Sequence, residues 1–317
     1  MSADKPRITI ITPIYNEEAG LEVYYEAVSQ VLISRDDAEY HVLLIDDGST
    51  DASWHLIESI CARSPRFQGL RLSRNFGAHA ALSAGIDHAE GDAVATLACD
   101  LQDPPETIIA FTECWRAGAE VVWGRRRSRE DTGWRVLTSQ LFFTAIRRHA
   151  MPRGSKFSTG SFFLIDRKVV ECFRRFRETN RITFALVAWT GFEQDVVLYD
   201  RRQRTTGTSG WTFGRMIKAM YDVFIGFSDL PARLITLAGG TVSLLSMLLA
   251  VYLLVNYLVH SVLPGWTGVM LALTTFFGLL FLILGIVGEY LHRIYTEVTG
   301  RPVYFISRQT GKTRGHD

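Results

Sequence analysis

Short apolar runs alternate with segments of helical periodicity over the first 126 residues. The run RITIITPI at residues 7–14 is rich in β-branched residues and predicts a buried strand. The segment at 16–32 has acidic residues near its start and apolar residues at helical spacing, which predicts a helix. The same criteria predict further strands within residues 40–47, 69–77, 91–100 and 120–126, and further helices at 52–63, 78–89 and 105–118.

The regular alternation of strand and helix, with short connections, predicts the fold class. It is typical of an α/β domain with an open, mostly parallel, doubly wound sheet. Ligands of such sheets bind beyond the carboxyl ends of the strands. Polar clusters follow the apolar runs at those ends, after Ile14, Ile45, Leu72, Cys99 and Trp123. We therefore expect the functional site at that edge, while residues 130–200 read as mixed helix and strand.

The pattern changes near residue 213. Residues 213–229 are amphipathic with a basic edge, which predicts a juxtamembrane helix lying in a membrane interface. Residues 230–290 contain two uncharged apolar stretches, each long enough to cross ~30 Å of hydrocarbon. Two buried helices of a large core are the alternative, but soluble cores rarely contain two uncharged stretches of this length. We therefore predict two transmembrane helices, followed by a tail at 291–317.

The distribution of basic residues predicts the orientation of these spans. The loop between them carries no Lys or Arg, whereas both outer flanks are basic, which places the flanks in the cytoplasm. The N-terminus lacks the apolar core of a secretory signal. We expect a multi-pass protein of the inner (plasma) membrane, with a cytoplasmic catalytic domain at residues 1–212.

Overall charge and cysteine content exclude other classes. Lys and Arg number 34 against 33 for Asp and Glu, so a nucleic-acid partner is not expected. The 4 cysteines form no CxxC pair, which is typical neither of a disulfide framework nor of a zinc site.

A candidate metal site follows the fourth predicted strand, in the segment TLACDLQDPPE. Asp100 and Gln102 lie two positions apart, so they point the same way if the extended geometry persists. A carboxylate and an amide oxygen suit Mg²⁺ or Mn²⁺, which also accept phosphate oxygens from a ligand. The alternative is a polar turn in which Asp103 caps the next helix.

Other polar residues at strand ends are candidates for contact with a ligand. Asp47 could accept hydrogen bonds from a ribose or a base, or simply close an Asp-Gly turn. Tyr15 and Glu17 could frame a base or ribose, or belong to a turn before a helix. Arg74 could meet ligand or solvent.

Arginines cluster after the fifth predicted strand and near residue 200. Arginine clusters grip phosphates bidentately, although a basic run is more often a solvated surface. Their place at the ligand edge, close to an anionic bilayer, favours phosphate contact. The arginines concerned are Arg125, Arg126, Arg127, Arg129, Arg201, Arg202 and Arg204.

Seven segments, taken in order along the chain, carry a family resemblance. They are PIYNEE, IDDGSTD, SRNFGAHAALSAGIDHAEGDAV, DLQDPPE, LVAWTGF, FSDLPARL and LGIVGEYLHRIYTEVTGRPVY. Together with the two long apolar stretches, they resemble the membrane-anchored polyprenyl-phosphate glycosyltransferases of glycosyltransferase family 2, relatives of dolichyl-phosphate mannose synthase. The resemblance covers nearly the whole chain.

The resemblance implies a GT-A fold and the transfer of a sugar from a nucleotide diphosphate to a polyprenyl phosphate, with inversion. By position, Pro13, Tyr15, Glu17 and Asp47 would hold the nucleoside. Asp100 and Gln102 would hold Mg²⁺ or Mn²⁺ on the diphosphate. Arg126, Arg129 and Arg204 resemble the arginines that meet donor or acceptor phosphates.

The donor and acceptor expected from the resemblance are UDP-glucose and undecaprenyl phosphate, with GDP-mannose or a modified UDP-sugar left open. Similar proteins associate through their membrane helices, so a homo-oligomer is a further expectation.

The chain departs from the family's pattern at three places. Ala98 stands where many relatives keep the first acid of a DxD pair. Ser161 and Phe163 replace the Asp and Arg of GDFRL, and that Asp is often assigned a catalytic role. Gly210 and Trp211 stand where GESKY would have a lysine.

Loss of the Asp does not by itself abolish transfer. A phosphate monoester has a second pKa of about 6, so it is already a dianionic nucleophile at neutral pH and needs no general base. We therefore expect an active enzyme with an altered sugar pocket. A nucleotide-sugar-binding scaffold without turnover is the main alternative. A processive synthase is disfavoured because Gln203 does not begin a QxxRW motif.

Overall fold

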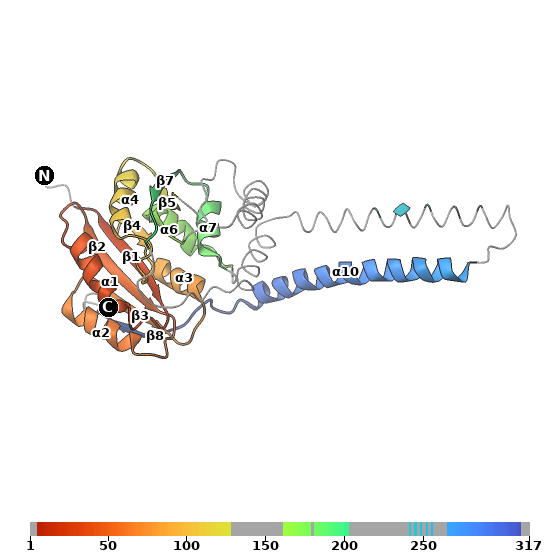
Figure 1. Ribbon diagram of the computed structural model, residues 1–317, viewed down its shortest axis with the longest axis horizontal. Helices are drawn as coiled ribbons and strands as arrows, with labels where there is room; N and C mark the ends of the chain where they lie inside the picture. The colour runs from red at the N-terminus through yellow and green to blue at the C-terminus, as the bar shows by residue number, and fades with distance from the viewer. Residues whose placement is uncertain are drawn as a thin grey trace. The chain divides into compact units, whose positions relative to one another are not determined.

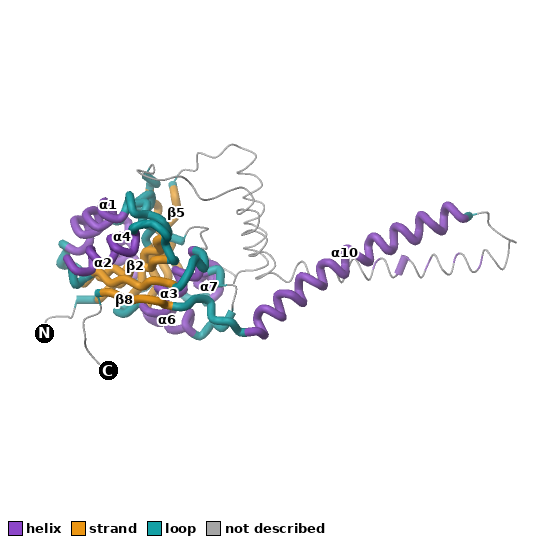
Figure 2. The backbone as a smooth tube through the Cα atoms, turned by 90° about the horizontal axis from the view of Figure 1, so that it is seen from below, coloured by secondary structure: helices purple, strands orange, loops and turns teal. Residues whose placement is uncertain are grey.

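The computed structural model describes residues 5–127, 161–178, 181–202 and 265–311, with six isolated positions between 241 and 255 (Figure 1, Figure 2). The chain divides into two compact units. The first comprises Met1–Val223 and Pro302–Asp317, and the second comprises Phe224–Arg301.

The first unit is built on one sheet, ordered β7-β5-β6-β4-β1-β2-β3-β8 in its described part. Strand β6 is antiparallel to β4 and β5, β8 is antiparallel to β3, and the other neighbouring pairs are parallel. The expected mostly parallel α/β sheet and its five strands are confirmed. The strands are β1 (Arg7–Ile14), β2 (Glu39–Asp46), β3 (Phe67–Leu72), β4 (Ala93–Thr96), β5 (Val121–Arg126), β6 (Phe163–Asp166), β7 (Gln194–Tyr199) and β8 (Ile306–Thr310).

Helices cover both faces of this sheet (Figure 1). Helices α1, α2 and α4 pack on one face, and α3, α6 and α7 pack on the other. All four predicted helices are confirmed, and the mixed structure expected for 130–200 is seen where that segment is described. The helices are α1 (Leu21–Val28), which continues as the π-helix η1 (Ser29–Ile33), α2 (Ser53–Arg63), α3 (Ala78–His88), α4 (Glu106–Arg116), α6 (Arg167–Arg174) and α7 (Thr183–Trp189).

The apolar run of β1 is continuous because the strand is buried on both faces. Ile8 and Ile10 are fully buried in the cluster beneath α1, α2 and α4. Ile11 faces α3, which approaches so closely that a Cβ on Gly85 would lie 3.0 Å from Ile11 and from Ile45. Each fully buried aliphatic side chain contributes about 1.5–3 kcal/mol, so burial on both faces holds this strand firmly in the sheet.

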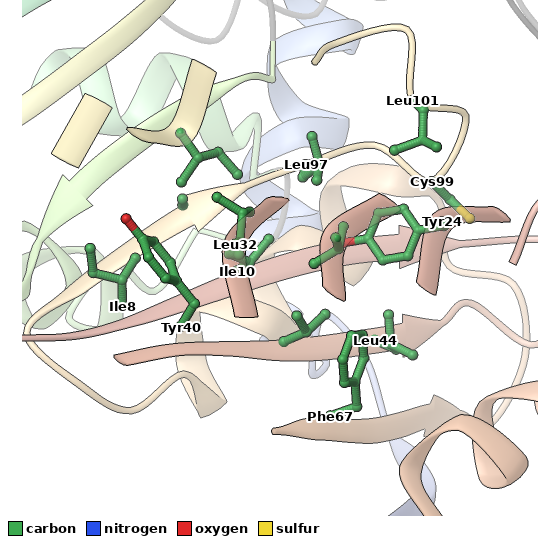
Figure 3. Packing of buried hydrophobic residues seen from close by; sticks show 14 of the residues in the cluster. Ile8, Ile10, Tyr24, Leu32, Tyr40, Leu44, Phe67, Leu97, Cys99 and Leu101 are labelled. Atoms are coloured by element: carbon green, nitrogen blue, oxygen red, sulfur yellow. The ribbon is translucent and has the colours of Figure 1, made fainter. Parts of the chain in front are cut away.

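The core also fixes the segment that follows β4. Leu97, Cys99 and Leu101 are buried in the same cluster as Tyr24 of α1 (Figure 3). The Tyr24 hydroxyl is itself buried and hydrogen-bonds with Thr12 of β1. The side chains of Leu97, Cys99 and Leu101 are therefore anchored in the hydrophobic core. Asp100, between the last two, lies at the carboxyl edge of the sheet.

The second unit contains α10 (Trp266–Thr299), which ends at Gly300 in the left-handed conformation, φ 60°. Leu273, Phe277, Leu280 and Leu284 are among its exposed apolar side chains. Among the described residues, no helix is sufficiently long and apolar to cross a bilayer. The interfacial helix predicted at 213–229 lies outside the described residues, and the two transmembrane helices stay a prediction.

The tail predicted at 291–317 is more structured than the sequence indicated. Helix α10 continues to Thr299, and β8 then adds to the sheet beside β3. The Ser307 hydroxyl donates to the backbone oxygens of Arg71 at 3.1 Å and Leu72 at 3.2 Å. A short polar strand has no apolar pattern of its own, so its pairing depends on the sheet edge that it meets.

Candidate functional site

The loops that follow β1 and β2 are joined by side-chain hydrogen bonds to backbone. The Asn16 N–H donates to Ser49 Oγ at 3.0 Å, and the Thr50 N–H donates to Asn16 Oδ1 at 2.9 Å. The Glu17 N–H donates to Ser53 Oγ at 3.0 Å. Asn16 has a positive φ of 54°, which Asn tolerates better than most residues. The two loops therefore form one connected wall at the carboxyl edge.

The predicted nucleoside residues of the first strand lie along this wall. Pro13 is half-buried beside Ile45 in the parallel register, and Tyr15 leaves 45% of its surface exposed. Glu17 is half-buried, and together with Asp100 its charge adds to the burial that raises the pKa of the Cys99 thiol. The fold thus brings Glu17 close to the loop that follows β4.

Asp47 has a structural task that the sequence did not reveal. Its buried carboxylate accepts hydrogen bonds from the backbone N–H groups of Phe76, at 2.7 Å, and Gly77, at 2.9 Å. Burial raises the pKa of this carboxyl, while the two backbone donors and the Arg74 charge oppose the rise. Each oxygen keeps lone pairs after these bonds, so contact with a nucleoside stays a prediction.

Two neighbours of Asp47 make this arrangement possible. Gly48 has a φ of 68°, and a Cβ there would lie 2.4 Å from the backbone carbonyl carbon of Arg74. Asp46 is fully buried, accepts the Ser49 N–H at 2.9 Å and pairs with Arg71 Nε at 3.1 Å. Sequence reasoning missed Asp46, although an acid inside an apolar run is a signal for a buried ion pair.

Arg74 lies in the loop after β3, beside Asp47. Its side chain is exposed, and its guanidinium lies 4.0 Å from the centre of the Phe76 ring. The guanidinium therefore stacks on the Phe76 ring while its exposed side can still meet a ligand at the carboxyl edge.

Asp100 and Gln102 lie at the same edge, but not in the geometry assumed from the sequence. Strand β4 ends at Thr96 and Leu101 has a φ of 52°, so the extended geometry does not persist through Gln102. Asp100 is half-buried and its Oδ1 accepts the Gln102 N–H at 3.2 Å. The amide oxygen of Gln102 accepts a hydrogen bond from the Arg201 guanidinium. Their role as metal ligands stays a prediction.

The donor set fits a cation that shares its ligands with phosphate. Among the described residues, no three His, Cys, Asp or Glu side chains are grouped to hold a metal. Mg²⁺ is commonly held by one or two carboxylates with phosphate oxygens and water rather than by an all-protein cage. Asp100 would supply the carboxylate of such a site, and the Gln102 amide oxygen in the same loop is the second candidate ligand.

Asp103 does not cap the helix that follows it. Helix α4 begins at Glu106 after Pro105, without a side-chain cap. The Asp103 carboxylate instead accepts a hydrogen bond from the hydroxyl of Tyr199, at the end of β7. The capping alternative is therefore wrong, because a distant strand competes for the carboxylate. No local sequence signal could have found Tyr199.

The arginines at the end of β5 and directly after it are exposed at the carboxyl edge, as expected. Arg126 lies opposite Tyr199 in the parallel register, and its charge opposes the burial that raises the pKa of Asp103. Arg127 forms a long ion pair with Asp200 at 3.7 Å. Arg129 and Arg204 lie outside the described residues.

The positions that depart from the family's pattern have different environments. Ala98 is half-buried just before Asp100. Ser161 is exposed before β6, and its carbonyl accepts the Thr96 hydroxyl. Phe163 is fully buried, with its ring centre 5.4 Å from that of Trp123, so an apolar side chain suits that position. Gly210 and Trp211 lie outside the described residues.

Comparison with known proteins identifies the family to which the chain belongs. Residues 9–174 match the family model described as glycosyl transferase family 2. An uncharacterized glycosyltransferase, sll0501, of Synechocystis sp. is 36% identical over 95% of this chain and 94% of its own length. The SfII prophage-derived bactoprenol glucosyl transferase of Shigella flexneri is 32% identical over 95% of this chain and 98% of its own.

Solved structures include weaker likenesses. The mannosyltransferase PcManGT of Pyrobaculum calidifontis, in complex with GDP-Man and Mn2+, is 20% identical with a TM-score of 0.46, over 63% of this chain and 59% of its own. The family assignment instead follows from the sequence matches, which span half of the chain for the family model and nearly all of it for the relatives. The chain belongs to glycosyl transferase family 2 and is a glycosyltransferase.

Proposed function

We propose that this glycosyltransferase transfers glucose from UDP-glucose to undecaprenyl phosphate at the cytoplasmic face of the plasma membrane, with inversion and with Mg²⁺ or Mn²⁺. The observation that carries the proposal is that Arg126 and Asp100 both lie near Asp103, in the loop that also carries Gln102, at the same edge of the sheet as the joined β1 and β2 loops. The relatives named bactoprenol glucosyl transferase support the lipid acceptor.

The wall and the arginine edge suit two anionic reactants. Tyr15 and Glu17 would frame the nucleoside, with Asp47 supporting the adjoining loop. Arg74 is exposed on the same side and would meet the donor. Arg126, and outside the described residues Arg129 and Arg204, would meet the phosphates. Guanidinium groups aimed at both phosphates would offset their repulsion and align the acceptor for attack on the anomeric carbon.

The leaving group and the nucleophile make different demands. Asp100 and Gln102 would hold the divalent cation, which when bound supplies positive charge to the departing nucleoside diphosphate. The acceptor phosphate is already dianionic near neutral pH, so no side chain must remove a proton from it. Ser161 in place of an acid is compatible with this mechanism.

The membrane part of the proposal depends on the apolar stretches at 230–290. Exposed apolar side chains on α10, such as Phe277 and Leu284, agree with a lipid-facing surface. We place the first unit on the cytoplasmic side because both flanks of these stretches are basic. Reporter fusions in the loop between the stretches and at both termini would test this orientation. Light scattering of the detergent-solubilised protein would test the expected homo-oligomer.

The activity can be tested directly with the full-length protein in detergent or nanodiscs. The protein would be incubated with radiolabelled UDP-glucose, undecaprenyl phosphate and Mg²⁺ or Mn²⁺, and the extracted lipid would be counted. Labelled lipid is expected, with a β-linked sugar if the α-linked donor is inverted. A parallel panel with GDP-mannose and modified UDP-sugars would identify another donor.

Arg126 provides a matched test of the arginine edge. Arg126→Ala should raise the KM for lipid phosphate or reduce kcat strongly, because a phosphate loses its cation. Arg35→Ala removes an exposed arginine from the loop before β2, at the other end of the sheet, and should leave both constants unchanged. Equal rates in both variants would remove Arg126 from the site.

A nucleotide-sugar-binding scaffold is the second candidate, and Ala98 and Ser161 are the observations that favour it. Binding of UDP without labelled lipid, for every donor in the panel, would support the scaffold and contradict the transfer.

A further inference from the structure

Hydrogen bonds join the end of β7 and the residues after it to the loop that carries the proposed metal ligands, and we call this set of contacts, from Tyr199, Arg201 and Arg202 to residues 100–106, the clasp. The Arg202 N–H donates to the backbone oxygen of Gln102 at 2.9 Å, and the Arg201 guanidinium donates to its amide oxygen. Arg202 also pairs with Glu106, at the start of α4, at 3.0 Å. The loop 100–106 is therefore tied to a strand almost a hundred residues later in the chain.

The centre of this clasp is the hydrogen bond from Tyr199 to Asp103. Tyr199 is only 7% exposed, and its ring packs edge-on against Phe162 with ring centres 5.2 Å apart. A Cβ on Gly124 would lie 3.1 Å from the Tyr199 ring, so glycine at this position of β5 leaves the ring its place. Burial raises the pKa values of both Asp103 and Tyr199. The Tyr199 ring is thus packed between Phe162 and Gly124 of β5, which fixes the position of its hydroxyl beside Asp103.

The same tyrosine links the loop to the arginine strand. Arg126 lies opposite Tyr199 in the β5–β7 register, and the Arg127 N–H donates to the Tyr199 backbone oxygen at 3.0 Å. Tyr199 therefore meets the metal-ligand loop through its hydroxyl, and the arginine strand both through its backbone and through a contact of the hydroxyl with the Arg126 side chain.

We infer that Tyr199 and Asp103 are positioning residues that fix the Asp100–Gln102 loop relative to Arg126, so that cation and guanidinium act on the same diphosphate. This inference rests on the proposed metal site. Neither residue needs to touch metal or substrate, because the hydroxyl–carboxylate bond sets the distance between the two ligand-bearing segments.

The test compares two Tyr→Phe variants of the full-length protein. Tyr199→Phe keeps the ring and removes the hydroxyl that serves Asp103. Tyr40→Phe removes another buried hydroxyl, which is 3.3 Å from both Asp37 and Thr112 in the core near the start of β2. Mn²⁺ binding in the presence of UDP would be followed by electron paramagnetic resonance, and folding by thermal unfolding.

Loss of one hydrogen bond in the clasp should weaken Mn²⁺ binding by about threefold to tenfold in Tyr199→Phe. Tyr40→Phe should leave the Kd for Mn²⁺ within twofold of the parent value. An Asp103→Asn variant, whose amide can still accept the tyrosine hydrogen bond, should fall between the parent and Tyr199→Phe.

Three outcomes would overturn the inference. If Tyr199→Phe binds Mn²⁺ as tightly as Tyr40→Phe, the clasp does not position the loop. If the two variants lose thermal stability equally and neither changes the Kd, the hydroxyl is structural only. If the parent protein itself binds no Mn²⁺ with UDP, the proposed metal site fails, and the inference fails with it.

Discussion

The carboxylate of Asp47 accepts a hydrogen bond from the backbone N–H of Gly77 at 2.9 Å, across the carboxyl edge of the sheet. Gly77 has a φ of 98° and immediately precedes α3, so this contact fixes the start of that helix. The other oxygen of the same carboxylate accepts a hydrogen bond from the Phe76 N–H. Asp47 thus holds the loop that carries Arg74 against the end of β2.

Replacing Asp47 with Ala should weaken both folding and donor binding. Two backbone N–H groups would lose their acceptor, which costs about 1–3 kcal/mol of unfolding free energy for each group left buried and unpaired. The loop carrying Arg74 would also lose its anchor, so the Kd for UDP should rise. Urea unfolding followed by tryptophan fluorescence, together with UDP titration, measures the two effects.

Asp36→Ala is the matched control, because Asp36 is exposed and pairs only with Lys5 in the described contacts. It should change neither quantity appreciably. A less stable Asp47→Ala protein that still binds UDP normally would confine Asp47 to a structural role.

Gly48→Ala should be much more damaging than a glycine replacement with a similar backbone conformation elsewhere. Gly48 has a φ of 68°, and its new Cβ would lie 2.4 Å from the backbone of Arg74. Gly191 has a φ of 75° with no atom within 4 Å of an added Cβ. Gly191→Ala should therefore lower the unfolding free energy only by the strain of a positive φ in alanine, about 1 kcal/mol. Gly48→Ala must also displace the neighbouring loop.

Urea midpoints of the two glycine variants check this difference. Comparable destabilisation by both would mean that backbone conformation alone matters at Gly48 and that the loop can move away.

The sheet was predictable because the apolar runs of β1 and β2 are long and mostly buried. Their length and β-branched content exclude most alternatives, and the carboxyl edge then follows from parallel order. Strand β8 was not predictable, because Ile306–Thr310 is mostly polar and pairs with an edge strand through its backbone. Local patterns carry little information about such a strand.

The candidate site was predictable in its location but not in its internal contacts. Asp100 and Arg126 follow apolar runs, so their edge could be read from the sequence. The partnership of Asp103 with Tyr199 spans 96 positions, and only the completed sheet brings the two together. Leu101 likewise adopts a left-handed conformation, φ 52°, that no local propensity favours.

Ala98→Asp should tighten metal binding. Ala98 is half-buried in the loop that carries Asp100, so a carboxylate there would add a second anionic ligand near the first. The concentration of Mn²⁺ that gives half-maximal activity should fall, and the Kd for Mn²⁺ with UDP should fall with it. Ala98→Asn adds similar volume without charge and should have a smaller effect. An unchanged Kd in Ala98→Asp would place residue 98 away from the cation.

Ser161→Asp should not accelerate transfer to a phosphate acceptor. Ser161 is exposed two residues before β6, so the new carboxylate would be tolerated. It would find no proton to remove, since the acceptor is a dianion, and its charge would repel the acceptor. The kcat at saturating lipid phosphate should therefore stay equal or decrease, and a rise of tenfold or more would show that a general base is needed.

Acid should destabilise the first unit partly through His41. Burial, together with the charges of Arg7 and Arg66, lowers the pKa of His41 to about 4, although Glu39 and Glu90 oppose the shift. The Arg66 guanidinium lies 3.0 Å from His41 Nε2, and because guanidinium only donates, the ring nitrogen must accept and stay neutral. In the unfolded chain this histidine would be protonated near the ordinary histidine pKa of 6.5. Its contribution to stability is therefore complete above pH 6.5 and is lost as the pH falls toward about 4.

His41→Gln should flatten the decline of the unfolding free energy, measured by urea titration between pH 7 and pH 4.5, by no more than about 1.4 kcal/mol per pH unit. Burial also lowers the pKa of His79 to about 4, so part of the decline in unfolding free energy should remain in His41→Gln.

His55→Gln is the control, because it replaces an exposed histidine and should leave the decline unchanged. Equal slopes in the two variants would show that protonation of His41 is not coupled to folding.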